Sequence, residues 1–218
     1  RLALAVDVLP GNETAPLHGM PGIWAWLDAL PKEARPAVLR GDVAYGSESV
    51  LCAAEARAQP YLTKLRLTKN VKALIKTLFR SNAWEEAGQG WEGVEDTLML
   101  SGWSRTRRVI VLRRALTGEM LLTGKDDDQE LLAFIESDVP TKRYEYAVLV
   151  TSTPYEILTL AQLYRDRADA ENNFDELKNQ WGWGGFTTQD LARCRLMARM
   201  VALVYNWWTL FVRLALDA

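Results

Sequence analysis

Four polar side chains recur along the segment from residue 164 to residue 178 at offsets of three, seven and fourteen positions: Tyr164, Arg167, Glu171 and Lys178. With about 3.6 residues per turn they fall within roughly 60° of arc on one helix face. The chain has two separated cysteines and one histidine, so any metal must be held by oxygen atoms such as those of Glu171. This mixed-charge face is a candidate functional site. The alternative interpretation is a solvated row of salt bridges.

A second acidic residue, Asp42, comes just after the expected strand 37–40, with Gly41 between them. A helix over residues 48–58, with Ser47 as its N-cap, and a further strand over 61–67 would complete a βαβ unit. Ligands of such units bind beyond the carboxyl ends of the strands, where Asp42 falls. The alternative is a turn aspartate beside Gly41.

The spacing Y-x-x-R-x-x-x-E-x-x-x-x-x-x-K resembles the signature of DDE-type bacterial insertion-sequence transposases. Residues 38–48 resemble the strand-to-helix turn that bears the second catalytic aspartate of this group. Residues 8–12 are similar to the loop after its third core strand. The resemblance runs in order from about Leu2 to about Leu214 and implies a ribonuclease-H-like fold, dependence on Mg²⁺ (Mn²⁺ is a possible substitute) and cutting and transfer of DNA strands at transposon ends.

The resemblance also implies roles for individual residues. Asp42 and Glu171 would be catalytic carboxylates that hold two Mg²⁺ ions about 4 Å apart. Arg167 would grip a phosphate with two hydrogen bonds, Lys178 would lie near a phosphate or base pair, and Tyr164 would donate a hydrogen bond to a phosphate oxygen. Transposon ends and target DNA would be the partners, bound by a homodimer in a synaptic complex.

Charge is distributed unevenly, although the net charge is only −2. Basic residues without an acidic neighbour fill residues 61–80, and several share one expected helix face that suits a DNA backbone; the alternative is a solvated lysine face. The DNA-binding candidates of this stretch are Lys64, Lys69, Lys72, Lys76 and Arg80. A second basic cluster comprises Arg105, Arg107, Arg108, Arg113 and Arg114.

Tryptophans are numerous, at nine in the chain. Trp91 and Trp103 could stack on an exposed base, but the commoner role of tryptophan is core packing. Core packing around the final helices is the expectation for Trp181, Trp183, Trp207 and Trp208.

The pattern predicts an α/β fold, a ribonuclease-H-like core over residues 1–81 and 147–218 interrupted by a β-rich insertion over 82–146. Residues 2–8 read as a buried strand and 23–30 as a short helix. Strands are expected over 97–100, 107–114 and 119–123, with a turn at 117–118. A long helix should run from about 190 to 216, and its apolar run 200–212 reads as a core helix too short to span a bilayer. The two widely separated cysteines predict a protein of the reducing cytoplasm, and no membrane partner is expected.

One departure from the family pattern concerns the first catalytic aspartate, which should lie upstream of residues 8–12. Asp7 is a weak substitute because it immediately precedes that loop. We therefore expect a truncated catalytic region that binds DNA without cutting it. A catalytically silent or regulatory DNA-binding fragment and another ribonuclease-H-like nuclease stay open as alternatives, and the role of Asp175 is undetermined.

Overall fold

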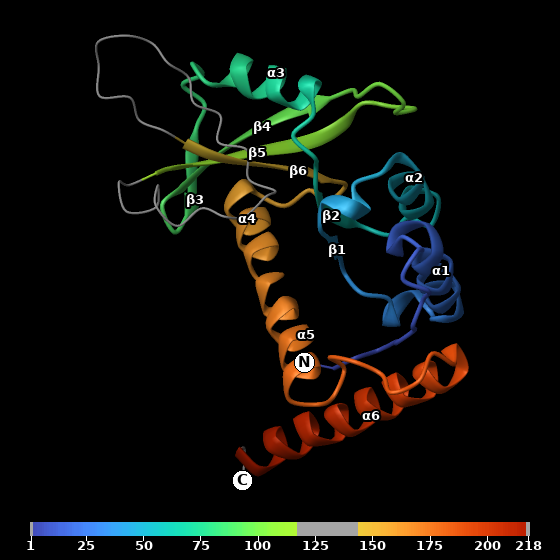
Figure 1. The fold of residues 1–218 in the computed structure, drawn as a ribbon. Coiled ribbons are helices and arrows are strands. Elements are labelled where there is room, and N and C mark those ends of the chain that lie inside the picture. Colours follow the sequence, from blue (N-terminus) through green and yellow to red (C-terminus); the bar gives the residue numbers. More distant parts are fainter. Residues whose placement is uncertain (1, 117–143, 217–218) are drawn as a thin grey trace. The chain divides into compact units, whose positions relative to one another are not determined.

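The computed structural model describes residues 2–116 and 144–216, which form two compact units (Figure 1). The sheet unit comprises Pro36–Asp166 and the helical unit comprises Arg1–Arg35 with Arg167–Ala218.

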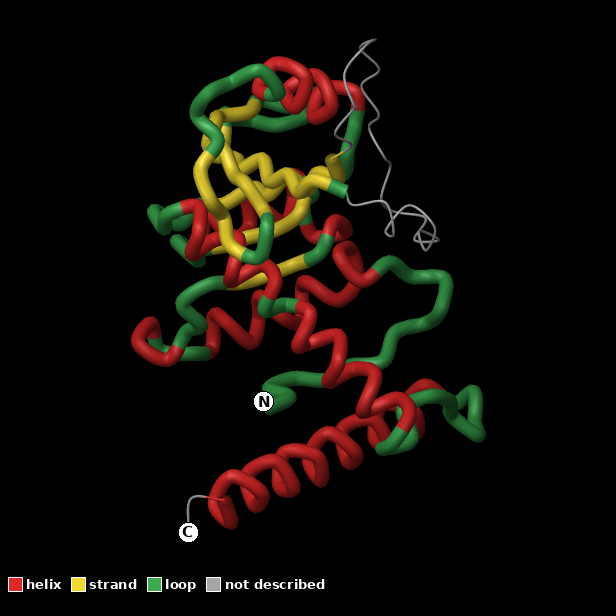
Figure 2. Tube along the Cα trace, turned by 90° about the vertical axis from the view of Figure 1, so that its left-hand side faces the viewer, coloured by secondary structure: helices red, strands yellow, loops and turns green. Residues whose placement is uncertain are grey.

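In residues 36–116 and 144–166, the sheet unit contains six strands in the order β1-β2-β6-β5-β4-β3. β1 is parallel to β2, with Leu39 opposite Tyr61, and all other neighbours are antiparallel. Figure 2 shows the strands of this unit gathered side by side. The strands are β1 (Leu39–Gly41), β2 (Tyr61–Lys64), β3 (Glu85–Gly88), β4 (Trp91–Leu98), β5 (Arg107–Ala115) and β6 (Tyr144–Thr151).

The central strands bury both of their faces, because helices cover each side of the sheet. On one face Ile110, Leu112 and Leu149 pack against Ile157 and Leu160 of α4 (Ile157–Arg165). The approach is close at β4, where a Cβ atom on Gly93 would lie 2.3 Å from the Cγ2 atom of Ile157. A side chain at this position would therefore overpack the interface between α4 and the sheet.

The opposite face carries the alternate residues of the same strands, including Val109 and Val148, which are fully buried. Figure 1 shows α3 (Lys69–Leu78) across the sheet from α4. The Phe79 ring, at the end of α3, meets Tyr144 of β6 edge-on with ring centroids 6.2 Å apart. The apolar runs of β5 and β6 are continuous, and successive residues face opposite sides of the sheet, so the two strands supply a core on each face.

The predicted βαβ unit is confirmed: β1, α2 (Glu48–Ala56) and the parallel strand β2 follow in that order. The mixed α/β class is also confirmed. Strands β3, β4 and β5, which fall in the segment expected to be an insertion, continue the same sheet as β1, β2 and β6. The strand expected over 119–123 and the turn at 117–118 lie outside the described residues.

The helical unit contains α1 (Met20–Ala29), α5 (Ala168–Asn179) and α6 (Leu191–Leu216), with a short π-helix at Ala15–Gly19 and a 3₁₀ helix at Lys32–Ala34. Asp190 caps α6 by accepting hydrogen bonds from the backbone N–H groups of Ala192 and Arg193 at 2.9 and 3.2 Å. The helices predicted near residues 23–30 and 190–216 are therefore confirmed.

The buried strand predicted over residues 2–8 is wrong. The segment forms no strand, and Leu4 is 68% exposed. Its backbone groups pair with side chains of α6 instead of a neighbouring strand: Asn206 bonds both the N–H and the carbonyl of Ala3 at 2.8 Å. Arg195 donates to the carbonyl of Val8 at 3.1 Å. An apolar run predicts burial, but only a neighbouring strand makes it a sheet strand.

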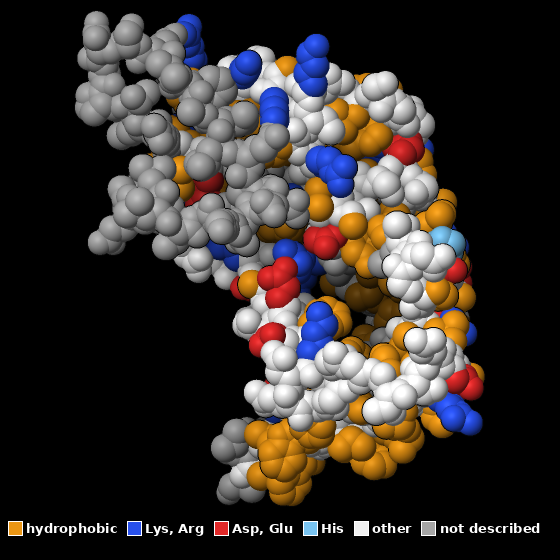
Figure 3. Space-filling model, in the orientation of Figure 1, with side chains coloured by type: hydrophobic (Ala, Val, Ile, Leu, Met, Phe, Trp, Pro, Cys, Tyr) orange, Lys and Arg blue, Asp and Glu red, His pale blue; other side chains and the backbone are white. Residues whose placement is uncertain are grey.

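The prediction of a core helix over residues 200–212 is also wrong. α6 turns small residues inward, including Ala198 and Ala202, whereas large apolar residues face outward. Trp207 is 62% exposed, and Phe211 is exposed to the same degree. Figure 3 shows hydrophobic side chains along the exposed side of α6. Within residues 2–116 and 144–216, no helix combines the length and apolar character that a bilayer crossing requires.

Candidate functional site

Asp42 begins the loop that joins β1 to α2, directly after Gly41, the last residue of the strand. Its Oδ1 atom accepts a hydrogen bond from the backbone N–H of Ala44 at 2.8 Å and caps the 3₁₀ turn Val43–Tyr45. The structure thus gives Asp42 the turn role that the alternative interpretation expected. The same turn holds the half-buried carboxylate at the carboxyl end of a parallel strand.

Two glycines make this loop compact. A Cβ atom on Gly41 would lie 2.7 Å from the Cβ atom of Tyr45, and one on Gly46 would lie 2.7 Å from the carbonyl oxygen of Lys64 in β2. The phenol of Tyr45 has a raised pKa because it is half-buried and because the charge of Asp42 is nearby. The loop around Asp42 is therefore closely packed on β2 and on itself.

The segment expected to be one helix from residue 164 to residue 178 is two helices. α4 ends at Arg165 and α5 begins at Ala168. Asp166 and Arg167 retain helical dihedral angles, at φ −61°, ψ −11° and φ −63°, ψ −31°, so the interruption is a local loss of helical hydrogen bonding. No glycine or proline marks it, and residue spacing could not predict it.

This interruption divides the four side chains of the signature between the units. Tyr164 belongs to the sheet unit and packs, half-buried, against the cluster beneath α4. Arg167, Glu171 and Lys178 belong to the helical unit, where the Nη1 atom of Arg167 lies 2.7 Å from Oε1 of Glu171. This pair is the salt bridge of the alternative interpretation, and the Glu171 side chain is 58% exposed.

The remaining acidic candidates of the helical unit are engaged locally. Asp175 is exposed and accepts a hydrogen bond from Nδ2 of Asn179 at 2.8 Å. Asp7 pairs with Nε of Arg195 at 2.9 Å and lies 4.0 Å from Nη2 of Arg199. As a first metal ligand, Asp7 would have to give up this pairing with two arginines.

Divalent ions such as Mg²⁺ prefer hard oxygen donors, and the carboxylates of Asp42 and Glu171 fit that preference. Asp42 lies in the sheet unit and Glu171 in the helical unit. Their convergence on one ion stays a prediction. In the described part of the chain, no three His, Cys, Asp or Glu side chains gather as a metal site.

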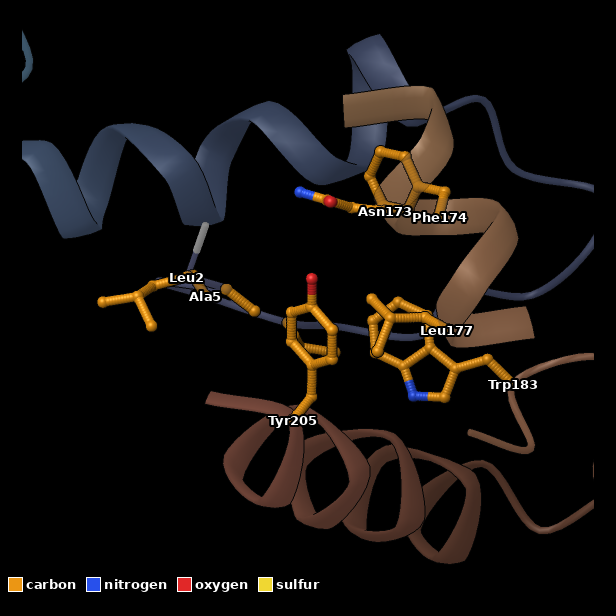
Figure 4. Close-up of a pocket in the computed structure, with 9 residues that line it drawn as sticks. Leu2, Ala5, Asn173, Phe174, Leu177, Trp183 and Tyr205 are labelled. Atoms are coloured by element: carbon orange, nitrogen blue, oxygen red, sulfur yellow. The ribbon is translucent and has the colours of Figure 1, made fainter. Parts of the chain in front are cut away.

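The helical unit also contains an apolar cavity of about 180 Å³. Figure 4 shows it between the N-terminal segment, α5 and α6, with Leu177, Trp183 and Tyr205 directed toward it. Asn173 is near its rim, and no charged side chain lines it. An apolar lining of this kind does not suit a divalent cation or a phosphate.

The basic helix predicted after β2 is confirmed as α3. Val71 and Ile75 are buried beneath it, while Lys69 and Lys76 are exposed and Lys72 is half-buried. These three lysines line a shallow depression on the surface, and Figure 3 shows Lys and Arg side chains gathered over α3. Lys64 is half-buried at the end of β2, and Arg80 is exposed in the turn after α3.

The second basic cluster has a different character, because its arginines pair with glutamates. Arg108 lies 2.5 Å from Glu95 and Arg113 lies 2.7 Å from Glu92. Arg114 pairs with Glu145, and Arg105 lies 3.5 Å from Glu55. The cluster is thus a set of cross-strand and helix-to-strand ion pairs.

Trp103 follows the commoner role, core packing, whereas two other tryptophans depart from expectation. Trp103 is 8% exposed with the guanidinium of Arg107 4.8 Å from its ring centroid, so it cannot stack on a base. Trp207 and Trp208 are exposed rather than packed, since they lie on the outer side of α6. Trp181 meets Tyr205 edge-on with centroids 5.8 Å apart, as core packing predicts. The ring of half-buried Trp91 lies beside Arg114.

Sequence reasoning missed a buried ionic network between α2 and β5. The Arg107 side chain is 2% exposed and binds Glu48 at 2.5 Å and Glu55 at 2.7 Å. Tyr61 donates its hydroxyl hydrogen to Glu55 at 2.8 Å. The available signal was the spacing of seven between the two glutamates, which places both on one face of α2.

Among known families, the family model described as Transposase DDE domain matches residues 2–207. No curated protein matches the chain.

Proposed function

Because the chain belongs to the Transposase DDE domain family, we propose that it contributes the catalytic region for cutting DNA at transposon ends and transferring the strands. The observation that carries the proposal is Asp42, fixed at the carboxyl end of β1 in a parallel βαβ unit, within the matched residues. That position suits a carboxylate ligand of a catalytic ion.

In this proposal Asp42 and Glu171 are the metal-binding carboxylates, and the fold is ribonuclease-H-like. When bound there, a pair of Mg²⁺ or Mn²⁺ ions would supply charge neutralisation at the phosphate, activation of the attacking oxygen and stabilisation of the leaving oxygen. The protein's part is to hold two carboxylates rigidly and to place the phosphodiester beside them. The test is cleavage of transposon-end DNA by the full-length protein, compared with its Glu171→Gln variant.

Three side chains of the signature are proposed to contact DNA. Arg167 exchanges its pairing with Glu171 for a phosphate when DNA binds, since a planar guanidinium binds two phosphate oxygens at once. Lys178, exposed in the last turn of α5, adds a positive charge beside the backbone. The hydroxyl of Tyr164 donates to a phosphate oxygen. A homodimer would bring two such sites to two transposon ends.

α3 and its flanks are proposed to bind the DNA backbone without reading sequence. The support is the basic surface of Lys69, Lys72 and Lys76, since α3 itself contains no acidic residue. Lys64 and Arg80, which flank α3 in the sequence, are proposed as further phosphate contacts.

Changing both Lys72 and Lys76 to alanine should weaken binding to unrelated DNA sequences alike. It should also lower the slope of log K against log salt by about two, because each phosphate contact releases roughly one counterion. Fluorescence anisotropy at several salt concentrations measures both. A Lys32→Ala, Arg105→Ala double variant removes the same charge elsewhere and should leave the slope unchanged. An unchanged slope for the α3 variant would contradict the proposed contact and leave a solvated lysine face.

The alternative function is a catalytically silent DNA-binding or regulatory protein. It shares the α3 surface and predicts DNA binding without cleavage products at any Mg²⁺ or Mn²⁺ concentration. The cleavage assay on the full-length protein separates the two functions.

A further inference from the structure

The loop that carries Asp42 ends where α2 begins, and that helix lacks the usual cap. Ser47 occupies the N-cap position, but its hydroxyl makes no hydrogen bond to the helix backbone and lies 3.3 Å from the hydroxyl of Ser49. An N-cap hydroxyl normally binds one of the first free N–H groups. The start of α2 must therefore be fixed by another contact.

That contact is made by Glu48, the first residue of α2, with groups on and just before β5. Its Oε2 atom accepts a hydrogen bond from Nη1 of Arg107 at 2.5 Å. Its Oε1 atom accepts from the backbone N–H of Ser104 at 2.8 Å and from the thiol of Cys52 at 3.1 Å. Both carboxylate oxygens are thus engaged, and the charge remains at all physiological pH values. Desolvation opposes ionisation, but the bonds from Arg107 and Ser104 prevail and lower the pKa of Glu48 to about 2.

Arg107 also holds the far end of the same helix. Its Nε and Nη2 atoms donate to the two carboxylate oxygens of Glu55 at 2.7 and 3.1 Å, and its guanidinium lies over Trp103. The two glutamates are seven positions apart, or about two turns. A single buried cation thus binds both ends of α2 to the strand.

The Asp42 loop is held between two fixed points. At one end Gly41 is paired in β1 with Thr63 of β2, and at the other Glu48 is bound to Arg107. Between them the loop rests on β2 at Gly46. Glu48 is only six positions after Asp42, whereas Glu55 is thirteen positions after it. A change at Glu48 therefore reaches the loop directly, and one at Glu55 does not.

We propose that Glu48 and Arg107 are positioning residues for Asp42: the ion pair between the buried Arg107 and the partly buried Glu48 fixes the start of α2 and with it the turn that presents the Asp42 carboxylate. This inference rests on the proposed function, in which Asp42 binds a catalytic ion. Neither residue needs to touch the ion or DNA. Partners of this kind tune a metal site through the orientation of its ligands.

The matched variants are Glu48→Gln and Glu55→Gln in the full-length protein. Each keeps the side-chain shape and replaces one carboxylate of the same guanidinium with an amide, so each weakens the network by a similar interaction. The measurement is hydrogen exchange of the loop amides without metal, at Ala44, Tyr45 and Gly46, against the amide of Ile110 in β5 as the global reference. Ala44 and Tyr45 report directly, since their N–H groups bind Asp42 Oδ1 and the Asp42 carbonyl.

Glu48→Gln should speed exchange of the loop amides about tenfold by local opening, with Ile110 unchanged, while Glu55→Gln leaves the loop at the wild-type rate. Equal acceleration in both variants, or no acceleration in Glu48→Gln, would overturn the proposal. If exchange of the Ile110 amide is also faster, the loop exchange rates are divided by the Ile110 rate before comparison. Equal acceleration in both variants, or none in Glu48→Gln, would still overturn the proposal.

Mn²⁺ binding, followed by electron paramagnetic resonance of the free ion, separates this inference from the function on which it rests. Glu48→Gln should weaken Mn²⁺ binding about tenfold and Glu55→Gln should not. Asp42→Asn should abolish binding at this site. Unchanged Mn²⁺ affinity in Asp42→Asn would contradict the metal role of Asp42, whereas loss in Asp42→Asn with equal affinities in the two glutamine variants would contradict only the positioning role.

Discussion

Changing Glu171 to glutamine in the full-length protein should slow cleavage of transposon-end DNA by about a thousandfold, equivalent to roughly 4 kcal/mol of transition-state stabilisation. The amide keeps the shape of the side chain but loses the charge that holds a divalent ion. DNA binding should stay nearly intact, because the change frees Arg167 from its 2.7 Å ion pair and leaves α3 untouched. Gel assays of strand products and of complex formation measure the two effects separately.

The matched control is Glu176→Gln, on the same helix. Glu176 accepts a hydrogen bond from the indole of Trp181 at 3.2 Å, which a glutamine carbonyl can also accept. This variant should cleave at the wild-type rate. Cleavage that survives Glu171→Gln, or equal loss in both variants, would contradict the catalytic role of Glu171.

Changing Arg107 to alanine should lower the free energy of unfolding by about 3–5 kcal/mol, because it leaves two partly buried carboxylates without their cation. Arg105→Ala is the control: Arg105 shares the partner Glu55 but is largely exposed, at 3.5 Å, so its loss should cost less than about 1 kcal/mol. Urea denaturation followed by tryptophan fluorescence measures both. Adding Glu48→Gln and Glu55→Gln to Arg107→Ala should recover part of the lost free energy of unfolding, because neutral amides replace the two carboxylates that are left without their cation.

The same network predicts a pH dependence with a definite sign. Glu48 titrates near 4.5 when unperturbed and at about 2 in the folded protein, so its contribution is complete above about pH 5 and is lost as the pH falls toward 2. Arg107→Ala removes the main partner that lowers this pKa. The variant should therefore lose less stability than the wild type between pH 5 and pH 2. Equal losses would show that the pairing with Arg107 does not stabilise the fold.

Local sequence patterns predicted those elements whose partners are near in the chain. The apolar–basic periodicity of α3 and the βαβ unit around Asp42 depend on contacts within about 30 residues, and both are confirmed. The strand prediction for residues 2–8 was wrong because an apolar run does not specify a neighbouring strand. Here Asn206 of α6, and not a strand, forms hydrogen bonds with the backbone of the segment. α6 itself was periodic enough to predict, but not the exposure of its large residues.

The candidate site shows the same division. The position of Asp42 at the end of β1 followed from the strand and the turn glycine. The pairing of Arg107 with Glu48 spans 59 positions and depends on how α2 lies on β5, which no spacing encodes. The signature spacing predicts one helix face, but its residues belong to two helices. The break between these helices, at Asp166 and Arg167, contains no glycine or proline that could have predicted it.

The most direct test is a structure of the full-length protein with transposon-end DNA and Mn²⁺, located by its anomalous scattering. The carboxylates of Asp42 and Glu171 should lie within about 8 Å of each other, with Mn²⁺ between them, the span set by two ions near 4 Å apart with ligands on each side. Carboxylates that face separate surfaces, with Mn²⁺ bound by neither, would contradict the account.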